Sequence, residues 1–184
     1  MMTTIYFVRH AHSIYTPDEL GRPLSAKGLK DAKHITELLR EKDIDLVYSS
    51  PYKRAIQTVH GIAQHISKHI ILEDNFKERR LSVDPVEDFQ AAIERVWHDD
   101  SFSFPGGESN RDAQKRGCKA LKNILAENER KNIVIGTHGN IMVLMMSYFD
   151  KTYGYQFWRT LEMPDIYKLV FKNFSLIDVQ RIWK

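Results

Sequence analysis

Short apolar segments rich in β-branched and aromatic residues alternate along this chain with longer segments in which apolar residues recur every three or four positions. The short segments are typical of buried strands, and the longer ones are typical of amphipathic helices. Strands that alternate with helices favour a mostly parallel sheet. We therefore predict an α/β fold with three layers, in which one central sheet is covered by helices on both faces.

Turn and capping signals bound these elements. The predicted strands cover residues 3–9, 44–49, 69–72 and 133–136. The predicted helices cover residues 25–42, 51–67, 85–98 and 110–129, and a further helix begins near Asn140. Ser25 is a suitable N-cap, and Ser109 with Asp112 three residues later resembles a capping box. Apolar and polar residues alternate on both sides of Asn173, which predicts a C-terminal hairpin and an antiparallel edge of the sheet.

Length and composition predict a single globular domain. The chain has 184 residues, of which 42% are hydrophobic and 11% aromatic, and such a chain can fill an ordinary core. We expect one domain over residues 1–184, with a short insertion at about 74–106 that covers the functional site. Cys118 is the only cysteine, so no internal disulfide and no cysteine metal cluster can form.

The charge and hydropathy patterns argue against nucleic-acid and membrane partners. The formal net charge is +3, and Lys and Arg are interleaved with Asp and Glu. Nucleic-acid binding is not expected without a concentrated basic patch, whereas a local anion pocket is compatible with this pattern. No apolar run approaches 18 residues, and Arg9 interrupts the first one. We expect a soluble, cytoplasmic protein, and no feature indicates its oligomeric state.

Charged and imidazole side chains follow the predicted strands at the points where those strands end. Arg9 and His10 follow the first strand, Arg54 opens the helix after the second, Glu78 follows the third, and His138 follows the last central strand. In an open α/β sheet, the loops at the carboxyl ends of strands form the binding site. A guanidinium group can donate hydrogen bonds to two phosphate oxygen atoms at once, and a helix N-terminus also favours an anion. The pattern therefore indicates a site for a phosphoryl group.

Five short motifs occur in order along the chain. They are Arg9-His10-Ala11, Leu24-Ser25-Ala26-Lys27-Gly28, Arg54-Ala55-Ile56-Gln57-Thr58, Gly107-Glu108-Ser109 and His138-Gly139. With these motifs the chain resembles the histidine phosphatase superfamily, in the branch that includes cofactor-dependent phosphoglycerate mutases and related phosphatases. Each motif alone is weak, whereas five in the right order are highly specific. The resemblance covers nearly the whole chain and implies a phosphoglycerate mutase-like fold.

The resemblance implies that His10 attacks phosphorus and becomes a phosphohistidine, while Arg9, Arg54 and His138 hold the equatorial oxygen atoms. The implied substrate-binding residues are Arg9, Ser13, Arg54, His138 and Gly139. Elementary electrostatics agrees, because positive charge around a transferring phosphoryl group stabilises its transition state. Nearby arginines also keep His10 neutral enough to attack.

Glu78 resembles the family's proton donor, and Glu108 is the alternative acid. Because arginines flank Glu78, we expect the incoming phosphate dianion to promote its protonation, so that proton uptake is coupled to substrate binding. The chemistry needs no metal ion and no cofactor. The implied partners are a small phosphorylated substrate and inorganic phosphate as the product.

Two residues depart from the family's first motif. Ala11 stands where the family has glycine, which is expected to add a methyl group near the phosphate and to require a particular φ. His12 replaces an acidic or amide residue. The chain is also too short for the full substrate-covering insertions of the mutases, so a phosphohistidine would be exposed to water. We therefore expect a phosphomonoester hydrolase, with mutase-type phosphoryl transfer as the alternative.

Other classes of protein also fit part of the pattern. A non-catalytic module could bind a phosphorylated ligand without turnover. His10 and His12 could form a metal pair as in metal-dependent amidohydrolases, because residues two apart on an extended segment point the same way. Those enzymes need a barrel of about 250 residues. His65 and His69 have a helical metal-pair spacing but lack the intervening glutamate.

Substrate choice is expected to depend on residues 74–106. The candidate residues there are Arg79, Arg80, Phe89, Trp97 and Phe102. The aromatic residues among them are more often core residues than ligand contacts. Phosphosugars, phosphoglycerates, nucleotides and phosphoproteins therefore all stay open as substrates.

Overall fold

A computed structural model describes residues 2–184 and contains one six-stranded sheet. Its strands are β1 (Met2–Arg9), β2 (Leu46–Ser49), β3 (Ile70–Leu72), β4 (Asn132–Thr137), β5 (Asp165–Lys172) and β6 (Ser175–Arg181). They lie in the order β3-β2-β4-β1-β5-β6. The strands from β3 to β1 run parallel, whereas β5 pairs antiparallel with both β1 and β6. The prediction of a mostly parallel sheet with an antiparallel edge is confirmed.

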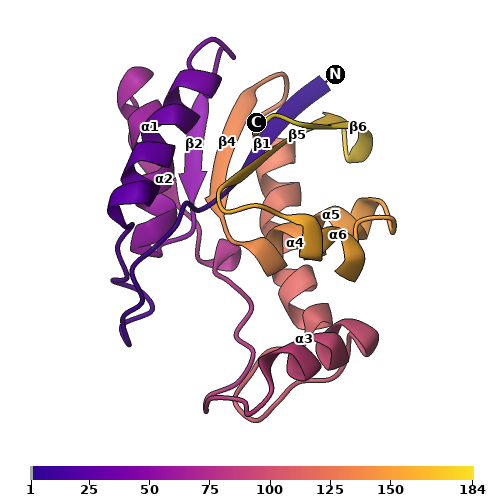
Figure 1. Cartoon of the computed structure of the whole chain (residues 1–184). Coiled ribbons are helices and arrows are strands. Elements are labelled where there is room, and N and C mark those ends of the chain that lie inside the picture. The colour runs from indigo at the N-terminus through magenta and orange to yellow at the C-terminus, as the bar shows by residue number, and fades with distance from the viewer. Residues whose placement is uncertain (1) are drawn as a thin grey trace.

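Helices cover both faces of this sheet (Figure 1). On one face lie α1 (Ala26–Leu39) and α2 (Lys53–His65), and on the other lie α4 (Asn110–Glu127) and α5 (Gly139–Phe149). The short helix α6 (Tyr155–Thr160) lies beside α5, and α3 (Phe89–His98) lies beyond the carboxyl ends of the parallel strands. The predicted three-layer arrangement is therefore confirmed. Within residues 2–184, no helix combines the length and the hydropathy needed to cross a membrane.

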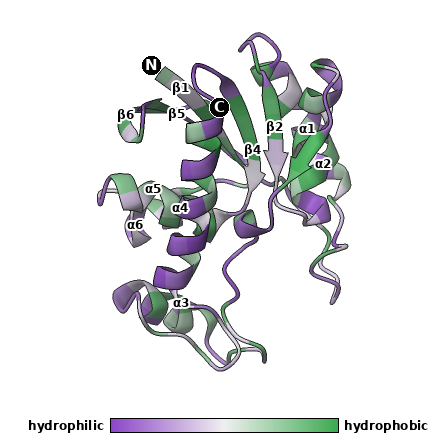
Figure 2. Ribbon diagram, turned by 180° about the vertical axis from the view of Figure 1, so that it is seen from behind, coloured by the Kyte–Doolittle hydropathy of each residue, from purple (hydrophilic) through white to green (hydrophobic). Residues whose placement is uncertain are grey.

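Alternating side chains on the central strands divide the core into two halves. In β1, Ile5 and Phe7 belong to the cluster under α4 and α5, whereas Tyr6 and Val8 belong to the cluster under α1 and α2. Successive side chains of a strand point to opposite faces, so one continuous apolar run fills both layers. In Figure 2, β2 and β4 are mostly green, which marks hydrophobic residues, whereas the ribbon of α4 is mostly purple, which marks hydrophilic ones.

Most predicted boundaries agree with the structure to within a few residues. The Ser25 and Ser109 hydroxyl groups accept N–H bonds at the starts of α1 and α4, which confirms both predicted caps. Helix α3 begins at Phe89, later than the predicted start at residue 85, because the Asp88 carboxylate caps it. Two short elements were not predicted, the 3₁₀ turn Asp74–Phe76 and the six-residue helix α6, which is too short to show a helical period.

A glycine lets α1 lie directly against the segment that follows β1. A Cβ atom at Gly28 would come within 2.1 Å of the carbonyl oxygen of His12. The same oxygen accepts the Ser25 N–H at 2.9 Å. Because only glycine permits this approach, the start of α1 fixes the segment that continues from His10.

Candidate active site

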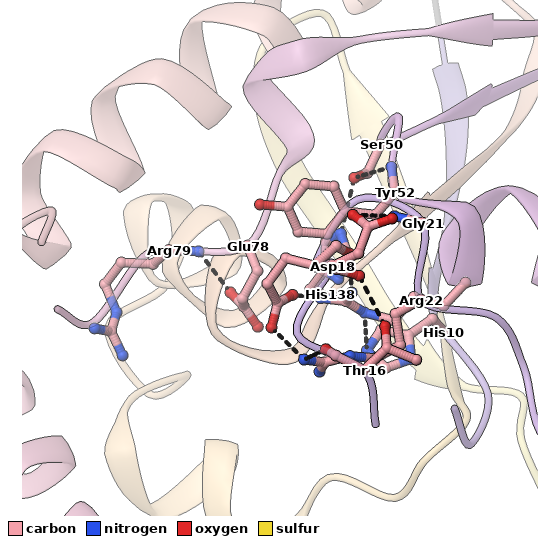
Figure 3. Close-up of polar contacts among 12 residues, drawn as sticks. His10, Thr16, Asp18, Gly21, Arg22, Ser50, Tyr52, Glu78, Arg79 and His138 are labelled. Atoms are coloured by element: carbon pink, nitrogen blue, oxygen red, sulfur yellow. Dashed lines mark hydrogen bonds and ion pairs between the residues drawn. The ribbon is translucent and has the colours of Figure 1, made fainter. Parts of the chain in front are cut away.

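The carboxyl ends of the parallel strands open into a cavity of about 820 Å³ that brings together residues from distant segments. The predicted site residues that line it are Arg9, His10, Ser13, Arg54, Glu78 and Gly139. His138 is fully buried, and its ring centroid lies 5.2 Å from that of His10. In Figure 3 the Glu78 side chain points toward the cluster that contains these two histidines. The predicted residues are therefore assembled at one place.

Hydrogen bonds orient the His10 ring so that Nδ1 is protonated and Nε2 keeps its lone pair. Nδ1 lies 2.8 Å from the carbonyl oxygen of Ala11, which can only accept, so Nδ1 carries the proton. Nε2 is then the acceptor of the Arg54 Nε donor at 3.3 Å. Burial, reinforced by the guanidinium groups of Arg54 and Arg9, lowers the pKa of His10 to about 3. The ring is therefore neutral near pH 7 and has a nucleophilic nitrogen atom.

His138 is held beside His10 by the loop that follows β2. Its Nε2 lies 2.8 Å from the Ser50 hydroxyl, and the Tyr52 ring packs edge-on at a centroid distance of 4.9 Å. Its Nδ1 is buried and has no hydrogen-bond partner among residues 2–184. Burial and the neighbouring His10 ring lower the pKa of His138. One nitrogen atom of this second ring is thus free for a ligand.

Two predicted arginines reach the cavity from different elements. Arg9 ends β1, and its Nη1 donates to the carbonyl oxygen atoms of Leu161 and Glu162 at 3.3 and 3.0 Å. Its buried Nε has no partner within residues 2–184. Arg54 lies in the first turn of α2 and is buried, with Nη1 donating to the carbonyl oxygen of Glu19 at 2.9 Å. Backbone carbonyl groups therefore orient both guanidinium groups before any ligand binds.

The loop between β1 and α1 places the carboxylate of Glu19 beside the guanidinium groups of Arg54 and Arg22. Glu19 Oε2 lies 3.0 Å from Arg54 Nη2, and Glu19 Oε1 lies 2.7 Å from Arg22 Nη2. Glu19 and Arg22 also line the cavity, and the Glu19 side chain is 54% exposed. An anion that binds Arg54 must compete with this carboxylate for N–H donors.

Glu78 is held by the first turn of α5. Its Oε1 accepts the backbone N–H groups of Arg79 at 2.8 Å and Ile141 at 3.0 Å. Its Oε2 accepts the Asn140 backbone N–H at 3.0 Å and makes a weaker contact with Asn140 Nδ2 at 3.4 Å. All four partners are donors, so a proton on Oε2 requires the weak Nδ2 contact to open.

Glu108, the alternative acid, does not line the cavity. Its carboxylate forms a two-point ion pair with Arg116, at 2.6 and 2.8 Å. Arg116 also donates to the carbonyl oxygen atoms of Asn75 and Lys77, at 2.6 and 3.0 Å. Glu108 and Arg116 therefore fix the segment that leads into Glu78, and Glu108 has no direct access to a ligand in the cavity.

The expected effect of Ala11 on the site is wrong. Its side chain packs with Leu24 and Ala32 in a small buried cluster, and the residue does not line the cavity. Its φ is not positive. The methyl group therefore points into the core under α1, where a small apolar side chain fits, and the backbone does not require glycine.

Neither histidine pair with a metal-ligand spacing is arranged to share a metal ion. The His12 Nδ1 pairs with the Ser25 hydroxyl at 2.8 Å, and His12 is exposed and does not line the cavity that contains His10. His65 ends α2 and His69 lies beyond it, so a helical spacing does not apply. No three His, Cys, Asp or Glu side chains within residues 2–184 are grouped so that they could hold a metal ion.

Sequence reasoning missed several residues of this site. Ser50, Glu19 and Arg22 were not predicted, although Ser50 follows β2 in the same way that His10 follows β1. Arg22 and Glu19 lie in an irregular loop whose sequence carries no comparable signal. Of the candidates in residues 74–106, Arg79, Arg80 and Phe89 line the cavity, whereas Trp97 and Phe102 do not.

Comparisons with known proteins find relatives among phosphatases and phosphoglycerate mutases. The chain is 29% identical over 155 residues to phosphoserine phosphatase 1 of Hydrogenobacter thermophilus, which covers 74% of this chain and 71% of that protein. It is 24% identical to the 2,3-bisphosphoglycerate-dependent phosphoglycerate mutase of Methanococcus vannielii, over 92% of this chain and 90% of the relative. The solved structure of a mycobacterial glucosyl-3-phosphoglycerate phosphatase matches with a TM-score of 0.80 at 18% identity, over 98% of this chain and 97% of that one.

The family model for the histidine phosphatase superfamily (branch 1) matches residues 5–173. That range includes most of β1, the following residue His10, the cavity-lining segment 79–83 and α5. This chain therefore belongs to branch 1 of the histidine phosphatase superfamily.

Proposed function

We propose that this protein is a phosphomonoester hydrolase that acts on a small phosphorylated metabolite through a phosphohistidine on His10, without a metal ion. The observation that carries the proposal is the neutral, buried His10 imidazole, whose Nε2 lone pair faces the Arg54 guanidinium in an arginine-lined cavity. A neutral nucleophile in a cationic cavity suits phosphoryl transfer.

In the first step, the His10 Nε2 lone pair attacks phosphorus, and the bond from phosphorus to the leaving oxygen breaks. The Glu78 carboxyl group gives its proton to that oxygen, so the alcohol departs neutral and Glu78 becomes a carboxylate. Arg9, Arg54 and the Nδ1–H of His138, whose Nε2 accepts the Ser50 hydroxyl, hold the equatorial oxygen atoms and stabilise their charge. The Nδ1–H bond to the Ala11 carbonyl supports the positive charge that develops on the phosphorylated ring.

In the second step, a water molecule attacks the phosphohistidine. The Glu78 carboxylate takes a proton from this water, the bond from nitrogen to phosphorus breaks, and His10 regains its lone pair. Inorganic phosphate is released, and Glu78 is again protonated for the next cycle. Atoms and charges balance over the two steps, because one water molecule is consumed for each ester bond broken.

Hydrolysis is proposed over phosphoryl transfer because the segment between β3 and α4, which lines one side of the cavity with residues 79–83, Phe89 and Ile93, is short. An accessible phosphohistidine reacts with water. Relatives of this chain are named as phosphatases and as mutases, and the phosphatase names include phosphoserine and glucosyl-3-phosphoglycerate among the substrates. We propose the same general class of substrate here, within one domain over residues 1–184 in which residues 74–106 cover the site.

The proposal is tested with para-nitrophenyl phosphate in the presence of a chelator. We expect wild-type protein to release phosphate and His10→Ala to lose at least about a thousandfold in kcat/KM, as removal of a catalytic nucleophile does. Radiolabelled phosphohistidine should be trapped on wild-type protein by quenching in an alkaline denaturant, because the bond from nitrogen to phosphorus is stable in base and labile in acid. The matched control is His34→Asn, an exposed histidine on α1. Tight phosphate binding without turnover in the wild type would overturn the proposal in favour of a non-catalytic binding module.

A further inference from the structure

Asp165 is a fully buried carboxylate at the start of β5, and the two steps above leave it unused. β5 runs beside β1 (Figure 1), and in their antiparallel pairing Asp165 lies opposite Arg9. We propose that Asp165 and Arg181 form a positioning pair, which holds the turn of residues 161–165 and thereby fixes Arg9 for the phosphoryl group. Neither residue lines the cavity. This role rests on the proposed function, because both residues act through Arg9 and do not touch the substrate.

The Asp165 carboxylate accepts four hydrogen bonds. Oδ1 accepts Arg181 Nε at 2.9 Å and the Ile166 backbone N–H at 3.0 Å. Oδ2 accepts Arg181 Nη2 at 3.1 Å and the Glu162 backbone N–H at 3.0 Å. A buried carboxylate is tolerated when a cation and hydrogen-bond donors surround it in this way. Asp165 is therefore fixed in place, and it fixes the Glu162 N–H in turn.

A single peptide group connects this carboxylate with the active-site arginine. It joins Leu161 to Glu162, and its N–H donates to Asp165 Oδ2 while its carbonyl oxygen accepts Arg9 Nη1 at 3.3 Å. The next carbonyl oxygen, that of Glu162, accepts the same Nη1 at 3.0 Å. An N–H group bound to a carboxylate makes the carbonyl oxygen of its peptide group a stronger acceptor, because successive hydrogen bonds polarise one another. Asp165 thus both orients and strengthens the support of Arg9.

Arg181 keeps the Asp165 carboxylate from pairing with Arg9 itself. Burial lowers the pKa of Arg9, and the nearby Glu78 and Asp165 carboxylates oppose that effect. Arg181 forms a two-point ion pair with Asp165 and a further ion pair with Glu162 Oε1 at 2.9 Å. A buried carboxylate that loses its cation attracts another one. Without Arg181, Asp165 would therefore draw the Arg9 guanidinium away from the phosphoryl group.

The test is a double-mutant cycle between Arg181→Gln and Arg9→Gln, in which calorimetry measures the binding of inorganic phosphate. Arg181→Gln alone should raise the Kd about threefold to tenfold, because Arg9 loses its position. In the Arg9→Gln background the same substitution should change the Kd by less than about twofold, because its effect passes through Arg9. Asp165→Asn should show the same dependence on Arg9. Arg181→Lys keeps a charge beside Asp165 but not the two-point geometry, so it should restore part of the affinity.

The matched control is Arg111→Gln, which breaks an exposed ion pair with Asp100 outside the cavity. It should leave the phosphate affinity unchanged in both backgrounds. Equal losses from Arg181→Gln in the wild-type and Arg9→Gln backgrounds would overturn the inference, because a purely structural role does not depend on Arg9. An unchanged phosphate affinity in Arg181→Gln would overturn it as well.

The Arg181 side chain is 38% exposed, which favours folding of its variants. If Arg181→Gln nevertheless does not fold, Arg181→Lys carries the same cycle with an expected change of about twofold to threefold, and equal changes in both backgrounds overturn the inference. Phosphate binding needs no turnover, so the cycle is separate from the proposed hydrolase. A wild-type protein without para-nitrophenyl phosphatase activity would refute the hydrolase alone. Phosphatase activity together with equal losses in both backgrounds would refute only the role of Asp165 and Arg181.

Discussion

At the scale of single residues, the carboxylate of Glu19 occupies N–H donors that a substrate phosphate needs. It pairs with Arg54 Nη2 at 3.0 Å and with Arg22 Nη2 at 2.7 Å, and it is half exposed. Because the Glu19 side chain is half exposed although both arginines are mostly buried, its carboxylate can move into solvent and leave both guanidinium groups to a phosphate dianion. While it is in place, however, it lowers the fraction of protein that is ready to bind an anion.

We therefore expect Glu19→Gln to bind phosphate more tightly. The competing charge is removed, and the inhibition constant of inorganic phosphate should fall by about twofold to fivefold, which corresponds to about 0.4–1 kcal/mol of competing interaction. The change should shrink at high salt. Competitive inhibition of para-nitrophenyl phosphate hydrolysis measures it, with Glu37→Gln on α1 as the control. Weaker phosphate binding in Glu19→Gln would show instead that Glu19 orients Arg54 for the ligand.

The residues that sequence reasoning found and missed differ in how they are positioned. His10, Arg54 and His138 follow a strand or open a helix, so the topology of an α/β sheet is enough to bring them together. Glu19 and Arg22 are placed by a loop whose path depends on its own tertiary contacts, such as the Arg22 bond to the carbonyl oxygen of Thr16. Local sequence carries no signal for such a path.

At the scale of elements, two helices fix the segment that carries Glu78. The first turn of α5 donates the backbone N–H groups of Asn140 and Ile141 to its carboxylate. From α4, Arg116 holds the carbonyl groups just before Glu78 and is itself held by Glu108. The sequence predicted both helices and offered both glutamates as candidate acids. The ion pair that keeps Glu108 out of the cavity, however, depends on how α4 packs against the segment before Glu78.

These different positions give Glu78 and Glu108 different kinetic signatures. Glu78→Gln should lower kcat/KM by about a hundredfold or more for an alkyl phosphate, whose poor leaving group needs a proton. Its effect on para-nitrophenyl phosphate, which has a good leaving group, should be much smaller. Glu108→Gln loosens the support of the segment and should affect both substrates equally. Selective loss on the alkyl phosphate in Glu108→Gln would reverse the assignment of the acid.

At the scale of the whole molecule, the site lies where the two halves of the core meet. β1 and β4 contribute to both apolar clusters, and each continues directly into a site histidine. His10 and His138 are therefore nearly or fully buried, and burial is the main cause that lowers the pKa of both. The chemistry and the stability of the fold thus depend on the same two neutral rings.

Stability should consequently decrease as the pH falls below about 6.5. In the unfolded chain each histidine takes up a proton near pH 6.5. The folded His10 does so only near its pKa of about 3, and that of folded His138 is also lowered. Between these pH values the unfolded state binds more protons, so the free energy of unfolding falls with pH by up to about 1.4 kcal/mol per pH unit for each histidine.

Urea unfolding at several pH values between 4.5 and 7.5 measures this dependence. His10→Asn removes one of the two groups, so the pH slope of its unfolding free energy should be smaller by about 1.4 kcal/mol per pH unit, whatever the absolute stability of the variant. His34→Asn is the control for a histidine-to-asparagine substitution at an exposed position outside the cavity. Equal slopes in wild type and His10→Asn would mean that the folded His10 takes up its proton at the same pH as an unfolded histidine. The neutral nucleophile on which the proposed mechanism depends would then be absent at mildly acidic pH.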